Sequence, residues 1–217
     1  AAFTRAIELL RLGELSLAKK ELSALGALGD RTDKNWVWLS AAMFHHAGDY
    51  SSAIRLMRRG PASIWTVTPN ATTRALWKIA YPPAYAAAID KTAAEAEVSP
   101  ALLSAIAREE SGFEARAVSP AKAYGLIQII VPTARIHARP LGLPSDAESL
   151  KKPEINLRIG AQFLRFLFLR YANNPAVVPA AYNAGYLATD RWLQSHAHTA
   201  FDEWVERIPY FETRNYT

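Results

Sequence analysis

Helical spacing of apolar residues limits the possible folds of this chain more than any other feature. Over residues 2 to 59, apolar side chains recur at intervals of three and four, which places them on one face of successive helices. The same spacing returns in a long segment that opens at Pro153 and ends near Asn173. No stretch carries a convincing β-strand pattern. The sequence therefore predicts an all-α protein.

A repeat organises the first part of the chain. Gly13-Glu14-Leu15 opens one helical segment, and Gly48-Asp49-Tyr50 opens a matching one 35 residues later. A helix, a tight glycine turn and a second helix that recur at about 34 residues are typical of tetratricopeptide-like arrays. Such arrays need about three units to bury their faces, and only two are visible here. We therefore expect residues 1–82 to be a truncated helical-repeat segment that serves as a scaffold or as a surface for a protein partner.

Prolines and glycines divide the remainder of the chain. Residues 60 to 70 interrupt the helical pattern, and Tyr81-Pro82-Pro83 cannot continue a helix interior. We therefore place a domain junction there and a second domain at residues 83–217. Further signals of this kind are a helix start at Pro175, a kink at Pro179 and a C-cap at Gly185.

The composition narrows the chemistry. None of the 217 residues is a cysteine, which excludes disulfides, thiolate metal sites and cysteine nucleophiles. A formal net charge of +5 suits an acidic partner such as nucleic acid, an anionic membrane or an anionic cell-wall glycan. The basic residues are scattered rather than gathered in a dense run, so we expect no nucleic-acid partner. No stretch approaches the roughly 18 apolar residues of a membrane-spanning helix, and residues 1 to 6 lack the order of a signal peptide.

Metal and phosphate chemistry find no support in the motifs. No two of the histidines share a helix face or stand near a carboxylate at the spacing of metal ligands, and they are His45, His46, His137, His196 and His198. The chain also lacks a phosphate-binding glycine loop and the nucleophile elbow of serine hydrolases. We therefore expect no metal site.

Glu110 is the strongest candidate for chemistry. Ser99-Pro100 predicts the start of a helix, with Ser as the N-cap, and this helix carries Glu110 in its last turn before Gly112. Apolar neighbours would raise the pKa of this carboxyl toward that of a general acid, whereas the alternative is an ordinary surface glutamate. Glu109 points about 100° away around the helix, and Glu114 lies beyond Gly112. A two-carboxylate glycosidase would have to recruit its second acid from far along the chain, so a mechanism with one carboxylate is attractive.

Five spaced motifs between Tyr81 and Tyr216 resemble the soluble lytic transglycosylases. Ala107 to Ser111 with Phe113 look like the family's Arg-x-Glu-Ser segment. Ser119-Pro120 and the run from Ala123 to Gln128 with Pro132-Thr133-Ala134 are similar to its next signature. The others are Asn156 with Gly160, Ala180 to Gly185, and Ile208-Pro209 with Glu212-Thr213-Arg214 and Tyr216. Five motifs in order are a specific signal.

This resemblance implies a lysozyme-like α catalytic domain, preceded by part of the family's superhelical repeat domain. It implies cleavage of the β-1,4 bond between N-acetylmuramic acid and N-acetylglucosamine in peptidoglycan, with formation of 1,6-anhydromuramic acid, no cofactor, and a periplasmic location. Glu110 would be the single acid and base. Ser111 and Gln128 would orient Glu110 and the sugar's N-acetyl group, and Tyr182 and Asn183 would line the groove. Glu212 would lie in the groove or pair with an arginine.

Several positions depart from the family pattern. Lys122 stands where the family has glycine, Ile127 where it has methionine, and Tyr186-Leu187 where it has Pro-Gly. We expect the last change to reshape the loop beside the groove. The chain stops at Thr217, earlier than most relatives, and is expected to lack a closing helix.

Three other functions remain open at this point. The first is a hydrolytic lysozyme of the same fold. The second is a glycan-binding module that has lost its activity. The third is a helical-repeat protein that binds a partner through residues 1 to 80.

Overall fold

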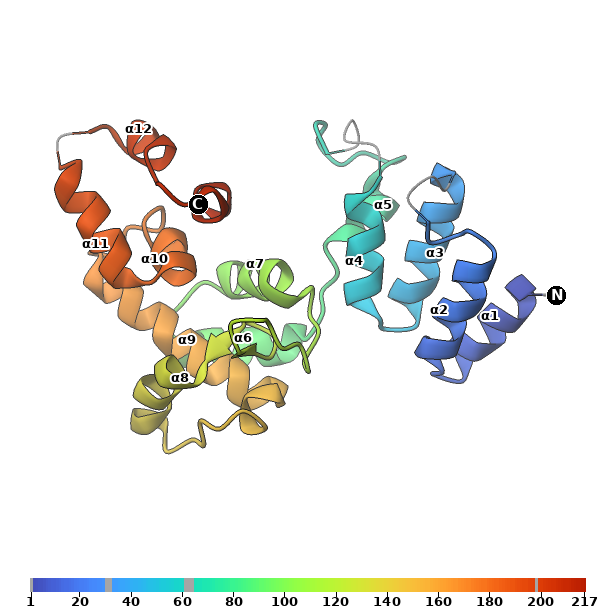
Figure 1. Cartoon of the computed structure of the whole chain (residues 1–217), viewed down its shortest axis with the longest axis horizontal. Coiled ribbons are helices and arrows are strands. Elements are labelled where there is room, and N and C mark those ends of the chain that lie inside the picture. The colour runs from blue at the N-terminus through green and yellow to red at the C-terminus, as the bar shows by residue number, and fades with distance from the viewer. Residues whose placement is uncertain (1, 30–32, 61–64, 198) are drawn as a thin grey trace.

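Two helical hairpins form the first part of the molecule. The computed structural model describes residues 2–29, 33–60, 65–197 and 199–217. The hairpins are α1 with α2 and α3 with α4, and α5 packs on α4 (Figure 1). Their bounds are α1 Ala2–Arg11, α2 Leu15–Ala24, α3 Lys34–His46, α4 Tyr50–Arg58 and α5 Arg74–Ala80. We call α1–α4 the hairpin segment. Its tetratricopeptide-like character stays a prediction, and Pro61, within the predicted break, lies outside the described residues.

The second part consists of eight α-helices in the described residues, with two short 3-10 turns at Arg139–Leu141 and Ser149–Lys151. The helices are α6 Ala86–Ala96, α7 Pro100–Ser111, α8 Val131–Ala138, α9 Pro153–Arg170, α10 Val178–Ala184, α11 Tyr186–Ser195, α12 Phe201–Glu206 and α13 Phe211–Tyr216. We call α6–α13 the C-terminal part. It confirms the all-α prediction. The domain junction predicted at Tyr81-Pro82-Pro83 falls in the connection between α5 and α6, and the division into two domains stays a prediction.

A short β-ladder corrects the expectation that strands are absent. β1 (Ala123–Tyr124) pairs antiparallel with β2 (Ile129–Ile130), with Ala123 opposite Ile130. Strands of two residues are too short to show an alternating pattern, which is why the sequence did not reveal them. Gly125 and Gln128 both have positive φ values in the turn between the strands.

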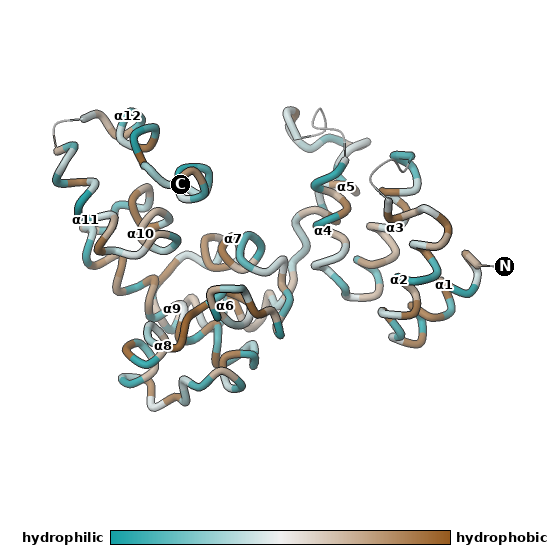
Figure 2. The backbone as a smooth tube through the Cα atoms, viewed as in Figure 1, coloured by the Kyte–Doolittle hydropathy of each residue, from teal (hydrophilic) through white to brown (hydrophobic). Residues whose placement is uncertain are grey.

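α9 forms the centre of the main core. Its buried face, which includes Leu157, Ile159, Leu164 and Leu167, packs among α6, α8 and α10. Figure 2 shows apolar residues gathered where these helices and α7 meet. A separate apolar cluster fills the hairpin segment, and it includes Phe44 and Met57.

The helix that follows the Pro175 turn begins later than the sequence predicts. α10 starts at Val178, so Pro179 lies in its first turn, where a missing N–H costs nothing. The expected kink at Pro179 is therefore wrong. Gly185 is the C-cap of α10, as predicted, with φ of 85°. Among the residues that the structure describes, no helix combines the length and apolar character that crossing a membrane requires.

Candidate active site

Helix α7 positions Glu110. The Ser99 side chain accepts a hydrogen bond from the N–H of Leu102, and Gly112 closes the helix in the left-handed conformation, as the sequence predicts. The Ser111 hydroxyl donates to the carbonyl of Leu126 (2.7 Å) and accepts from the N–H of Glu114 (3.1 Å). These bonds hold the last turn of α7 against the loop before β2, so the backbone at Glu110 is fixed in place.

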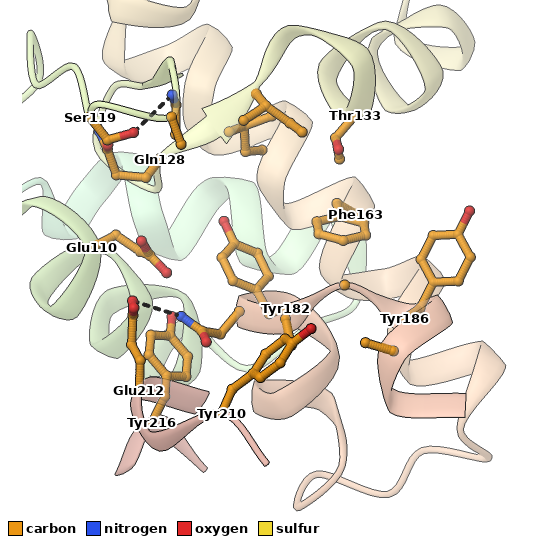
Figure 3. A pocket seen from close by; sticks show the side chains of 18 of the residues that line it. Glu110, Ser119, Gln128, Thr133, Phe163, Tyr182, Tyr186, Tyr210, Glu212 and Tyr216 are labelled. Carbon is orange, nitrogen blue, oxygen red and sulfur yellow. Dashed lines mark hydrogen bonds between the residues drawn. The ribbon is translucent and has the colours of Figure 1, made fainter. Parts of the chain in front are cut away.

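Glu110 faces a large cleft of about 1660 Å³. Small-molecule sites usually occupy roughly 300 to 1,000 Å³, so this cleft has room for a segment of a polymer. Its walls come from α7, the loop before β1, α8, α9, α10, α11 and α13. In Figure 3 the Glu110 carboxylate points into the space between Gln128, Tyr182 and Tyr216.

Burial changes the acid strength of Glu110. It raises the pKa of this carboxyl from the usual 4.5 to about 7, and the negative charges of Glu212 and Glu109 act in the same direction. Tyr216 opposes them, because its hydroxyl favours the ionised carboxylate. That hydroxyl is buried and has no hydrogen bond of ordinary geometry, although it lies close enough to Glu110 to influence it. At neutral pH the carboxyl is therefore present in both protonated and ionised forms.

Tyr182 forms the wall opposite Glu110. Its hydroxyl donates to the carbonyl of Ile127 (2.6 Å), and its ring lies 5.4 Å from that of Phe163, centroid to centroid. Burial and the nearby Glu110 charge raise the pKa of the phenol, so it stays neutral. Tyr182 therefore offers a rigid apolar surface beside the acid.

Asn156 holds the loop that carries Gln128. This side chain is completely buried; its oxygen accepts from the N–H of Ile127 (2.9 Å) and its nitrogen donates to the carbonyl of Tyr124 (2.9 Å). The Gln128 amide donates to the carbonyl of Gly125 (2.8 Å) within the same turn and lines the cleft. Asn156 thus fixes one edge of the cleft although it does not line the cleft itself.

Asn183 and Glu212 meet at the other side of Glu110. The amide of Asn183 donates to Glu212 (3.4 Å), and its oxygen accepts from the hydroxyl of Thr213 (2.6 Å). Figure 3 shows the contact between Asn183 and Glu212 as a dashed line. Glu212 lies in the cleft and contacts this amide rather than an arginine, which favours the first of its two predicted roles.

Five of the six predicted site residues line one cleft, namely Glu110, Gln128, Tyr182, Asn183 and Glu212. Ser111 does not line it. One position along a helix turns a side chain by about 100°, so Ser111 faces the loop before β2 while Glu110 faces the cleft. The effect of Tyr216 on the acid was missed; its place in the last family motif was the only signal for it.

The structure shows where each departure from the family pattern lies. Lys122 has a φ of 58°, a conformation that glycine adopts without strain, and its side chain is not part of the cleft wall. Ile127 is fully buried in the core. Tyr186 and Leu187 open α11 immediately after Gly185 and line the cleft.

Among the described residues, no group of three or more His, Asp or Glu side chains is arranged to hold a metal ion. His137 is buried, with its ring 4.9 Å from that of Phe163, so it contributes to packing. His198 lies outside the described residues.

Fold and site together define a lysozyme-like helical fold with one carboxyl of raised pKa in a large cleft that aromatic side chains help to line. Residues 87–205 match the family described as the Transglycosylase SLT domain. The chain therefore belongs to this family, which confirms the resemblance seen in its motifs.

Known proteins with similar sequences and structures agree. The chain is 33% identical over 162 residues to the soluble lytic murein transglycosylase of Escherichia coli K12, which covers 70% of this chain and 25% of that protein. The structure of an inactive mutant of lytic transglycosylase Slt from Pseudomonas aeruginosa superposes with a TM-score of 0.81 and 30% identity, over 99% of this chain and 33% of that one. The structure of the 70-kDa soluble lytic transglycosylase in complex with bulgecin A superposes with a TM-score of 0.80 and 26% identity. This match covers 99% of this chain and 33% of that one. The chain spans about a quarter of the length of the curated relatives it matches.

Proposed function

We propose that this protein is a peptidoglycan lytic transglycosylase in which Glu110 is the single acid and base. The observation that carries the proposal is the pKa of about 7 for a carboxyl inside a polymer-sized cleft. One group that must first give and then take a proton works best when its pKa lies near the working pH. Family membership and the names of the relatives support the same reaction.

The mechanism needs only groups that the cleft and the substrate supply. Protonated Glu110 donates its proton to the glycosidic oxygen while the bond to C1 of the muramic acid breaks. The substrate's own N-acetyl group stabilises C1 in place of a second carboxylate. Ionised Glu110 then takes the proton of the C6 hydroxyl, whose oxygen attacks C1 and closes the 1,6-anhydro ring. Glu110 ends protonated, so the enzyme is ready for another cycle.

The other carboxylates near Glu110 already have partners. Glu109 is paired with Arg58 (2.8 Å) and with Arg108, and Glu212 accepts from Asn183. Both negative charges favour the protonated form of Glu110, which the first step requires. The relatives are named as murein transglycosylases, and we propose the periplasm as the place where this protein meets the same polymer.

Digestion of purified peptidoglycan, followed by mass spectrometry, tests this function. The wild type is expected to release muropeptides that end in the anhydro sugar, each lighter by one water than the hydrolysed product. Glu110→Gln should release none while still binding the polymer. Products with a free reducing end would instead identify a hydrolytic lysozyme. Binding of the polymer without released products, equal in the wild type and in Glu110→Gln, would point to a glycan-binding module without this chemistry.

A further inference from the structure

One face of α4 in the hairpin segment is turned toward the active-site helix. Tyr50, Ile54 and Arg58 stand four residues apart and therefore share this face. Ile54 belongs to the main core of the C-terminal part, and Tyr50 packs against that core. A Cβ on Gly112, the C-cap of α7, would meet the Cα of Ser51 at 3.4 Å. The hairpin segment thus touches α7 at the turn that carries Glu110.

At the end of this face, a chain of charges leads to the residue beside Glu110. Arg58 donates to the Glu109 carboxylate (2.8 Å), which also pairs with Arg108. Arg108 donates to the carbonyl of Ala80 (2.9 Å), at the end of α5. Its guanidinium lies 4.1 Å from the ring of Tyr81. Glu109 is therefore held by one arginine from the hairpin segment and one from α7 itself.

We propose that Arg58 is a positioning residue of the active site, which acts from the hairpin segment by holding and neutralising the Glu109 carboxylate next to Glu110. The proposal rests on the proposed function of Glu110. It gives the hairpin segment a part in the reaction besides any binding of partners. The ion pair is about half exposed on both sides, with side-chain exposures of 48% and 46%, so it contributes little to the stability of the fold.

The electrostatic consequence has a definite sign. The groups that act on Glu110 are Glu109 on α7 and Glu212 and Tyr216 on α13, and the neutral phenol of Tyr182 on α10 lies nearby. The negative charge of Glu109 raises the pKa of Glu110. Arg58 pairs with Glu109 and carries the opposite charge, so on our proposal it offsets this rise. Removing Arg58 therefore keeps Glu110 protonated to higher pH. Removing the Glu109 charge has the opposite effect.

The test is the pH profile of kcat/KM on purified peptidoglycan for Arg58→Ala, Glu109→Gln and the double variant. Activity falls as Glu110 loses its proton, which defines an alkaline limb. Arg58→Ala should move this limb to higher pH and Glu109→Gln should move it to lower pH. Each shift should be roughly 0.3 pH unit, the effect that a unit charge about 10 Å away has in water. The double variant should lie close to the wild type, because the two removed charges act on Glu110 with opposite signs.

Two controls separate this role from a structural one. Arg58→Lys keeps the charge and should keep the wild-type limb. Arg5→Ala breaks an exposed ion pair with Glu21 (2.9 Å) inside the hairpin segment and should leave the limb unmoved. The proposal is overturned if the alkaline limbs of Arg58→Ala and Glu109→Gln stay in place or move in the same direction. This holds even if a variant is slower and melts at a lower temperature than the wild type. A wild type that releases no anhydro product would overturn the proposed function instead.

Discussion

Because the pKa of Glu110 is raised, we expect replacement of its carboxyl by a group that does not titrate to stabilise the protein. This gain should appear only above acidic pH. The pKa rises from 4.5 in the unfolded chain to about 7 in the folded one. Below pH 4 the carboxyl is protonated in both states, so its full contribution to stability is present. Between pH 4.5 and 7 the unfolded chain releases the proton and the folded chain keeps it, which lowers the free energy of unfolding. At about 1.4 kcal/mol per pH unit, the loss is roughly 3 kcal/mol by pH 8.

Glu110→Gln removes this titration and keeps the shape of the side chain. Urea unfolding of both proteins at pH 4 and pH 8 measures it, because every other titrating group is common to the two. The advantage of Glu110→Gln over the wild type should grow by roughly 3 kcal/mol between the two pH values. Glu14→Gln, at an exposed glutamate in the turn before α2, is the matched control and should show no comparable change. An advantage of Glu110→Gln that is equal at both pH values would refute the argument from burial.

Three further substitutions test how the cleft is built. Asn156→Ala leaves the N–H of Ile127 and the carbonyl of Tyr124 buried without partners, so urea unfolding should show a loss of about 2 to 5 kcal/mol. A loss below about 1 kcal/mol would contradict this role of Asn156. Tyr216→Phe removes the hydroxyl that favours ionised Glu110, so the alkaline limb of kcat/KM should move to higher pH; a downward movement would show that the hydroxyl acts differently. Gly160→Ala places a Cβ 1.5 Å from Cδ1 of Ile127 and should cost about 1 to 3 kcal/mol. Adding Ile127→Val, which removes Cδ1, should recover part of that loss, and additive effects of the two would argue against this clash.

Local signals predicted the helix that carries Glu110. Ser99-Pro100 and Gly112 bound α7 as expected, because capping depends on residues next to each other in the chain. Pro179 misled the prediction, since a proline inside a helix and a proline in its first turn look alike until the start of the helix is known.

Contacts between distant segments could not be predicted from the sequence. The family motifs named Asn156 and Tyr216 but gave no hint that one ties the loop before β2 and the other tunes the acid. The pairing of Arg58 with Glu109 joins residues 51 positions apart, and an arginine at the end of a helix carries no mark of its partner. Such effects depend on how helices pack, which short-range spacing does not encode.

Heavy-oxygen water offers the most direct test of the central claim, that Glu110 activates the substrate's own C6 hydroxyl and not water. Purified peptidoglycan is digested in this solvent and the muropeptides are analysed by mass spectrometry. We expect anhydro products that carry no heavy oxygen at C1, and no products from Glu110→Gln. Products with heavy oxygen at C1 would show that water attacks the bond, and would contradict the account.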